Sequence, residues 1–146
     1  IRENIHDGNP SASVEQIMQA IKFASLDKLI ADLPKGVETD VGANGANLSG
    51  GQKQRIGIAR AGVKDAKLFI FDEATSALDA DNERRVLCNL SQIKGRATIL
   101  FVTHRPAALE YVDRVLFLDE GRISGFGTYD DLLENNEKFR LLLKGS

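Results

Sequence analysis

The chain has 146 residues, 42% of them hydrophobic, and a formal net charge of −2, which fits one globular domain. No apolar run is long enough for a transmembrane helix or a signal peptide, so we expect a soluble chain. No long basic block is present, so we expect no nucleic-acid partner.

The first third of the chain is patterned as short helices. Residues 1–5 read as the end of a helix, closed by a turn over residues 7–10. Ser13 and Gln16 form a capping-box pair that predicts the start of a second helix. A third helix is expected before Pro34, and a loop from Lys35 to Asn47. The apolar faces of the second and third helices are predicted to be Val14, Ile17, Ile21 and Ala24, and Leu26, Leu29, Ile30 and Leu33.

A glycine-rich turn, Leu48-Ser49-Gly50-Gly51-Gln52, opens the next predicted helix. Ser49 is a good N-cap, and Gln52 three residues later completes a capping box. Gly50 and Gly51 carry no Cβ, so an anion can approach their backbone N–H groups at the positive end of the helix dipole. Taken alone, the turn can also be explained as an ordinary capped helix after a loop, without an anion site.

The helix after this turn is expected to extend to about Val63, with Ile56, Ala59 and Val63 facing the core. Arg55 and Arg60 are expected to point elsewhere.

A buried strand over residues 68–71 ends in Asp72 and Glu73, and a second over residues 98–103 is followed by His104. The helix expected between them, over residues 79–93, makes this a βαβ unit with parallel strands. Continuous apolar runs predict that both faces of the strands are covered. The single cysteine, Cys88, lies in the intervening helix and is expected to be a buried, reduced thiol.

The last third is expected to contain a short helix over residues 106–111 and strands over residues 115–118 and 123–126. A turn through Glu120-Gly121 joins the strands, and residues 129–143 have helical spacing.

These pieces, in this order, resemble the ATP-hydrolysing domain of ABC transporters. Leu48 to Gln52 is similar to the family signature, and Leu68 to Glu73 to its Walker B strand. Ser76-Ala77-Leu78-Asp79 resembles the D-loop, and His104 the switch histidine. The resemblance runs from Ile1 to about Leu143.

The resemblance implies an α/β fold. A helical subdomain over residues 1–64 precedes the C-terminal half of a RecA-like P-loop NTPase core over residues 65–146, a parallel sheet with flanking helices. The two segments together form part of one nucleotide-binding domain.

The resemblance also implies a site for ATP and Mg²⁺. Asp72 would hold the Mg²⁺, Glu73 would orient and deprotonate the attacking water, and His104 would contact the γ-phosphate. Because the carboxyl ends of parallel strands share one edge of a sheet, we expect these three residues to meet there. The residues expected to bind the ATP of an opposite subunit, in a dimer with two ATP molecules between the domains, are Ser49, Gly50, Gly51, Gln52 and Asp79.

Two departures from the family pattern affect these expectations. The chain contains no G-x-x-x-x-G-K-[ST] phosphate loop, which in the family lies upstream. The resemblance implies that the parent protein hydrolyses ATP. Without this loop, we expect the isolated chain to be inactive. Ala43 stands where exporters usually have a glutamate, in the loop that contacts the membrane domain. In the family, some neighbours of the two strands come from the upstream half. In the isolated chain we therefore expect an exposed strand edge and uncovered faces that expose Leu, Ile and Phe, and hence self-association.

The first functional interpretation is an exporter-type ABC ATPase subunit, held at the cytoplasmic face of a membrane by a missing membrane domain. Its partners would be that domain and a second nucleotide-binding domain. The alternatives are a soluble ABC ATPase of nucleic-acid repair or translation, and a non-catalytic fragment.

Overall fold

A computed structural model describes residues 1–144, which fall into two compact units, Ile1–Thr103 and the described residues from His104 onward. Helices and strands alternate in the mixed pattern expected of an α/β protein. Among the described residues, no helix combines the length and the apolar composition needed to cross a bilayer. The predicted division near residue 64 stays a prediction, and the last two residues of its second segment lie outside the described residues.

Three short helices begin the first unit: α1 (Arg2–His6), α2 (Val14–Phe23) and α3 (Asp27–Asp32). The predicted capping box of α2 is confirmed, because Gln16 N donates to Ser13 Oγ and Ser13 N donates to Gln16 Oε1. On its apolar face, Ile17, Ile21 and Ala24 are buried, but the prediction is wrong for Val14, which is 63% exposed. Val14 is the first residue of the helix, one turn before the buried stripe begins.

The predicted loop between α3 and the glycine-rich turn over residues 48–52, which we call the signature turn, is confirmed. It contains only two single-turn 3-10 helices, η1 (Gly36–Glu38) and η2 (Ala43–Gly45).

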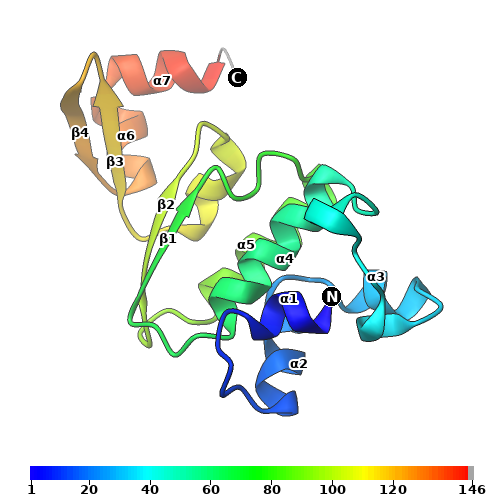
Figure 1. Cartoon of the computed structure of the whole chain (residues 1–146). Coiled ribbons are helices and arrows are strands. Elements are labelled where there is room, and N and C mark those ends of the chain that lie inside the picture. The colour runs from blue at the N-terminus through cyan, green and yellow to red at the C-terminus, as the bar shows by residue number, and fades with distance from the viewer. Residues whose placement is uncertain (145–146) are drawn as a thin grey trace. The chain divides into compact units, whose positions relative to one another are not determined.

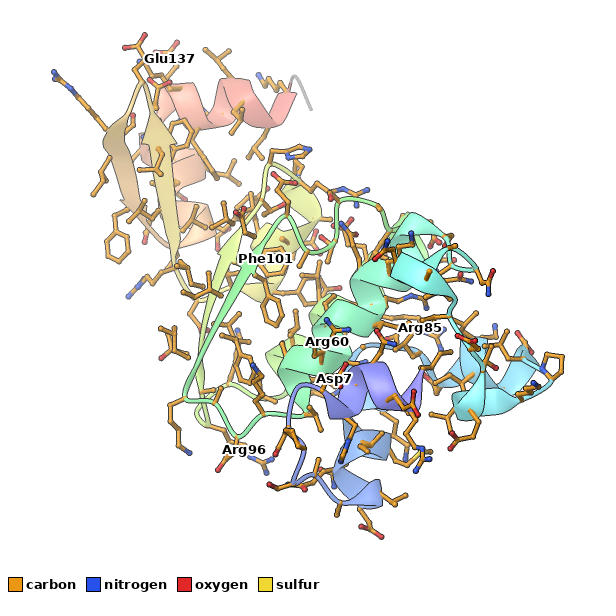
Figure 2. All side chains as sticks on the ribbon, viewed as in Figure 1. Asp7, Arg60, Arg85, Arg96, Phe101 and Glu137 are labelled. Carbon is orange, nitrogen blue, oxygen red and sulfur yellow. The ribbon has the colours of Figure 1, made fainter. Side chains whose placement is uncertain are left out.

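Helix α4 (Gly50–Gly62) follows this loop and packs against α1 and α2. Ile56, Ala59 and the C-cap residue Val63 are buried, as predicted. Arg60 reaches α1, where its Nε and Nη2 donate to the backbone and side-chain oxygens of Asn4 at 2.7 and 2.8 Å (Figure 2). The expectation that Arg55 points away from the core is wrong, because its side chain extends into the contact between α4, the α2–α3 turn and α5.

Strands β1 (Leu68–Asp72) and β2 (Thr98–Val102) form a two-stranded sheet, and α5 (Ala80–Ser91) lies between them in sequence. The strands are parallel, with Leu68 opposite Thr98 and Asp72 opposite Val102, which confirms the predicted βαβ order. Figure 1 shows β1 and β2 side by side, with the helices of the unit on one side of them.

The apolar runs of the two strands suit two covered faces, but the uncovered face that is expected in the isolated chain is confirmed. Phe69 and Phe71 are buried on one face of β1, whereas Leu68 and Ile70 on the other face are 55% and 62% exposed. Since successive side chains of a strand point to opposite faces, helices on one side cover only every second residue. The same alternation leaves the outward side chains Leu100 and Val102 of β2 exposed.

Helix α5 turns Val86, Leu87 and Leu90 toward the core. The expectation that Cys88 is buried is wrong, because this free thiol is exposed. At 3.6 residues per turn, position 88 lies on the side of the helix away from the stripe that the other three form.

The second unit contains η3 (Pro106–Tyr111), the antiparallel strands β3 (Val115–Asp119) and β4 (Arg122–Gly127), α6 (Tyr129–Asn135) and α7 (Glu137–Lys144). Residues 129–143 thus form two helices. Asn136 separates them, because its Oδ1 accepts from Phe139 N at 2.9 Å and its Nδ2 donates to Ser124 O at 2.8 Å. Val115, Leu132 and Phe139 form the core of this unit.

Candidate functional site

The signature turn is ordered by its own side chains. Ser49 N donates to Gln52 Oε1 at 2.9 Å, and Gln52 N donates to Ser49 Oγ at 3.3 Å. The predicted capping box is therefore present at the start of α4. The N–H groups of Gly50 and Gly51, at the first two helical positions, have no acceptor within the helix. Ser49 and Gly50 are exposed, so this positive helix end is accessible from solvent.

The two glycines have different surroundings. A Cβ on Gly51 would lie 2.8 Å from the backbone oxygen of Ala77 and 3.2 Å from Leu78 Cδ2. A Cβ on Gly50 would meet only Ala77 Cβ, at an ordinary 3.4 Å. Gly51 is therefore explained by close packing of the signature turn on the D-loop segment of the same chain, a reason that the sequence did not reveal.

The end of β1 leads into a turn over residues 73–77, which we call the 73–77 turn. Asp72 is exposed and Glu73 is half-buried. Glu73 has a φ of 50°, in the left-handed region that a non-glycine residue adopts only at a cost of about 1–3 kcal/mol. Its N–H donates to Val102 O of β2 at 3.0 Å, and its carbonyl accepts from Ser76 N at 3.0 Å and from Ser76 Oγ at 2.8 Å.

Gln54 of α4 adds further hydrogen bonds to the 73–77 turn. Its Nε2 donates to Glu73 O at 3.2 Å and to Ser76 Oγ at 2.8 Å, and its Oε1 accepts from Ala77 N at 2.8 Å. Sequence reasoning assigned Gln54 no role. The sequence held one indication of this role. Residues four apart on a helix share a face, so Gln54 lies on the same face of α4 as Gly50 of the signature turn.

A series of hydrogen bonds joins the start of α5 to Arg55 of α4 and to the turn between α2 and α3. Asp79 is the N-cap of α5 and accepts from Asn82 N at 2.9 Å and from Asn82 Nδ2 at 2.7 Å. These hydrogen bonds hold the pKa of the exposed Asp79 carboxyl below its usual value. Asn82 Oδ1 in turn accepts from Arg55 Nη1 at 3.0 Å, and the same nitrogen donates to Ser25 O at 2.9 Å. Burial lowers the pKa of the Arg55 guanidinium, and the nearby Asp79 carboxylate opposes that shift.

A buried pair fixes the middle of the 73–77 turn. Thr75 Oγ1 donates to Glu83 Oε1 of α5 at 2.8 Å, and both residues are buried. Residue type alone favours an exposed Glu83, since charged residues are rarely buried. Its spacing of three, four and seven residues from Val86, Leu87 and Leu90 nevertheless places it on the buried face of α5.

His104 is the first residue of the second unit, whereas Asp72 and Glu73 lie in the first unit. The prediction that all three meet at one edge therefore stays a prediction. In the described part of the chain, no group of three or more His, Cys, Asp or Glu residues is arranged to hold a metal ion. A single carboxylate such as Asp72 still fits Mg²⁺, which proteins often bind through one or two carboxylates together with substrate phosphates.

Comparisons with known proteins show what the chain is similar to. A family model described as ABC transporter matches residues 1–76, more than half of the chain. The mycobactin import ATP-binding/permease protein IrtB of Mycobacterium tuberculosis (strain ATCC 25618 / H37Rv) is 45% identical over 139 residues, which cover 95% of this chain and 24% of that protein. The leukotoxin translocation ATP-binding protein LktB of a Pasteurella haemolytica-like species is 43% identical over 136 residues, covering 93% and 19%.

One solved structure, of a bacterial Atm1-family ABC exporter with ATP bound, matches with a TM-score of 0.91 and 36% sequence identity. The match covers 99% of this chain and 25% of the exporter chain. The chain thus spans about a quarter or less of the length of the proteins that it resembles.

Proposed function

Because the chain belongs to the ABC transporter family, we propose that it is the catalytic and helical part of an ATPase domain that drives transport across a membrane. The observation that carries the proposal is the direct contact between the signature turn and the turn after β1. Gly51 approaches the Ala77 backbone so closely that no side chain fits between them, and Gln54 hydrogen-bonds the Glu73 carbonyl. The contact joins the segments that resemble the signature and the catalytic carboxylate.

Glu73 is the catalytic base in this proposal. A carboxylate at the end of a strand can accept a proton from a water molecule and direct that water toward a phosphorus atom. The Glu73 backbone is held on both sides, by Val102 O at its N–H and by three donors at its carbonyl. Such restraint favours catalysis, because the position of a general base determines the alignment of the attacking water.

The start of α4 binds the γ-phosphate of an ATP molecule held by an opposite subunit. The backbone N–H groups of Gly50 and Gly51, the Ser49 hydroxyl and the Gln52 amide supply donors at a helix N-terminus, where the dipole favours negative charge. The capping box fixes this turn in advance. Asp79 lies at the same subunit interface in this proposal, and its hydrogen bonds with Asn82 keep the carboxylate ionised.

Asp72 is the residue that would hold Mg²⁺, and the ion would neutralise charge that develops on the phosphate oxygens. His104 would contact the γ-phosphate and help to fix the attacking water. The assignments of Asp72 and His104 rest on the resemblance and on their positions after β1 and β2.

Two partners belong to the proposal: a second nucleotide-binding domain and a transmembrane domain, which would hold this chain at the cytoplasmic face of a membrane. The solved relative is an exporter, and its match over 99% of this chain supports an exporter-type domain. One relative is named an import protein, so the direction of transport and the cargo belong to the complete protein.

The test is ATP turnover by the complete protein that carries this chain, with and without Glu73→Gln. The amide keeps the shape of the side chain but cannot take a proton, so kcat should fall to near the background rate while ATP still binds. Glu134→Gln, which changes an exposed glutamate of α6, is the matched control and should leave kcat unchanged. Equal turnover in the Glu73 variant and the wild type would remove Glu73 from the base role.

A further inference from the structure

One side chain of α4, Gln54, makes three hydrogen bonds to the 73–77 turn. Its amide nitrogen donates to Glu73 O and Ser76 Oγ, and its amide oxygen accepts from Ala77 N, at distances of 2.8–3.2 Å. Gln54 is half-buried, so this amide is partly shielded from competing water. A single group therefore contacts both ends of the turn.

The Glu73 backbone needs outside support. Its φ of 50° lies in the left-handed region, which a residue with a Cβ occupies in a folded protein only when its surroundings hold it there. Of the donors to the Glu73 carbonyl, Ser76 N and Ser76 Oγ belong to the turn itself, and Gln54 Nε2 comes from α4. Gln54 also donates to Ser76 Oγ, so it orients the hydroxyl that serves as the second donor.

The helix that carries Gln54 also carries the signature turn. Gly51, in the first turn of α4, lies so near the Ala77 carbonyl that a Cβ at this position would be 2.8 Å from its oxygen. Gln54, in the next turn, accepts a hydrogen bond from the Ala77 N–H. A displacement of the start of α4 must therefore move Ala77 or break one of these contacts. Because Gln54 binds the Glu73 carbonyl as well, the displacement also reaches the peptide that carries the Glu73 side chain.

We propose that Gln54 is a positioning residue, which holds Glu73 in its strained backbone conformation and ties that conformation to the position of the signature turn. The inference rests on the proposed function, because it takes Glu73 as the group that directs the attacking water. Gln54 itself touches neither ATP nor water in this proposal. Through Gln54, the alignment of Glu73 at one ATP molecule depends on the position of α4. The start of α4 binds the γ-phosphate of the other ATP molecule in the dimer.

The amide group suits this task, because it donates and accepts at the same time. A methionine fills a similar volume but makes neither hydrogen bond. A glutamate can still accept from Ala77 N, but it cannot donate to the Glu73 carbonyl and places a negative charge beside it. The Gln54→Met and Gln54→Glu variants thus separate the contact with Ala77 from the contact with Glu73.

The experiment measures the kcat and the KM for ATP of the complete protein with Gln54→Met or Gln54→Glu. Misplacement of a catalytic group by about 1 Å can cost about a hundredfold in rate. We therefore expect kcat to fall by about tenfold to a hundredfold in both variants, with the KM within about twofold of the wild type. Arg60→Met is the control, because it removes two hydrogen bonds from the same helix at its contact with Asn4, away from the 73–77 turn.

A second readout does not depend on activity. Hydrogen exchange at the Ala77 amide should become faster in Gln54→Met, which lacks an acceptor, and stay slow in Gln54→Glu, which keeps one. A structural role alone would lower kcat equally in Gln54→Met and Arg60→Met, and that result would overturn the inference. Unchanged exchange at Ala77 in Gln54→Met would also overturn it.

Glu73→Gln, measured in the same preparation, separates the two possible failures. If Glu73→Gln abolishes turnover and the Gln54 variants behave like Arg60→Met, the positioning role is wrong and the proposed function stands. If Glu73→Gln leaves turnover unchanged, the proposed function fails and the inference fails with it.

Discussion

The Glu73 carbonyl accepts a 3.2 Å hydrogen bond from the Gln54 side chain, which links the first two turns of α4 to the end of β1. Glu73 is separated from Gln54 by 19 positions in the sequence and has a positive φ of 50°. The strained backbone and its support thus come from different elements, a common arrangement where strain serves a function.

Gly51→Ala should destabilise the first unit, whereas Gly50→Ala should be tolerated. The new Cβ at position 51 would lie 2.8 Å from the Ala77 backbone oxygen, so either α4 or the 73–77 turn must shift. Overpacking of this kind costs about 1–3 kcal/mol. At position 50 the nearest atom is a side-chain Cβ at 3.4 Å, and alanine also favours a helix over glycine. Urea unfolding of the two variants measures the difference, and equal midpoints would contradict the packing argument.

Much of this arrangement could be predicted from the sequence. The capping boxes at Ser13 and Ser49 and the order of strands around α5 follow from local patterns, because caps and periodicity depend on neighbouring residues. The contacts of Gln54 and Arg55 could not be predicted, since their partners lie 19 to 30 positions away. The exposed face of β1 was expected from its apolar run, which is typical of a strand with both faces covered, together with the missing upstream neighbours.

The stability of the first unit should depend on pH through Asp79. Hydrogen bonds with Asn82 lower the pKa of this carboxyl below its ordinary value of 3.8, so the folded state favours the ionised form. The stabilising contribution is present above pH 3.8 and is lost as the pH falls through the lower pKa of the folded state. Asp79→Asn keeps an N-cap without a titrating group, so its stability difference from the wild type should shrink on acidification. Urea unfolding at about pH 6 and about pH 3 checks this. A difference that grows toward low pH would contradict the assignment.

The 146-residue chain by itself should bind Mg-ATP weakly and show negligible ATPase activity. The proposed contacts with Mg-ATP come from Asp72, Glu73 and the signature turn, and they involve only the γ-phosphate and the metal. The sequence does not contain a phosphate loop, whose backbone and lysine would hold the other phosphates. Calorimetric titration with Mg-ATP is the measurement. Micromolar affinity in a pure preparation would show that the described residues suffice for binding.

The isolated chain should also self-associate through the exposed side of its parallel sheet. Leu68, Ile70 and Leu100 are 52–62% exposed on that face, and a two-stranded sheet leaves unpaired backbone groups along both edges. Ile70→Lys should reduce the mass measured by light scattering at low micromolar concentration. Val14→Lys, which changes an equally exposed apolar residue of α2, should not. A wild-type chain that stays monomeric, or that dimerises only with Mg-ATP, would refute this expectation.

The most direct test of the account is the assembly state of the complete nucleotide-binding domain with Glu73→Gln. If Glu73 directs hydrolysis and the signature turn binds the ATP of the opposite subunit, blocked hydrolysis should leave the ATP-bound dimer trapped. Sedimentation analysis should then find dimers with Mg-ATP and monomers without nucleotide. Adding Ser49→Arg, which replaces the N-cap hydroxyl of the signature turn with a bulky side chain, should abolish the dimer. Dimers that form equally without ATP, or that persist with Ser49→Arg, would contradict the account.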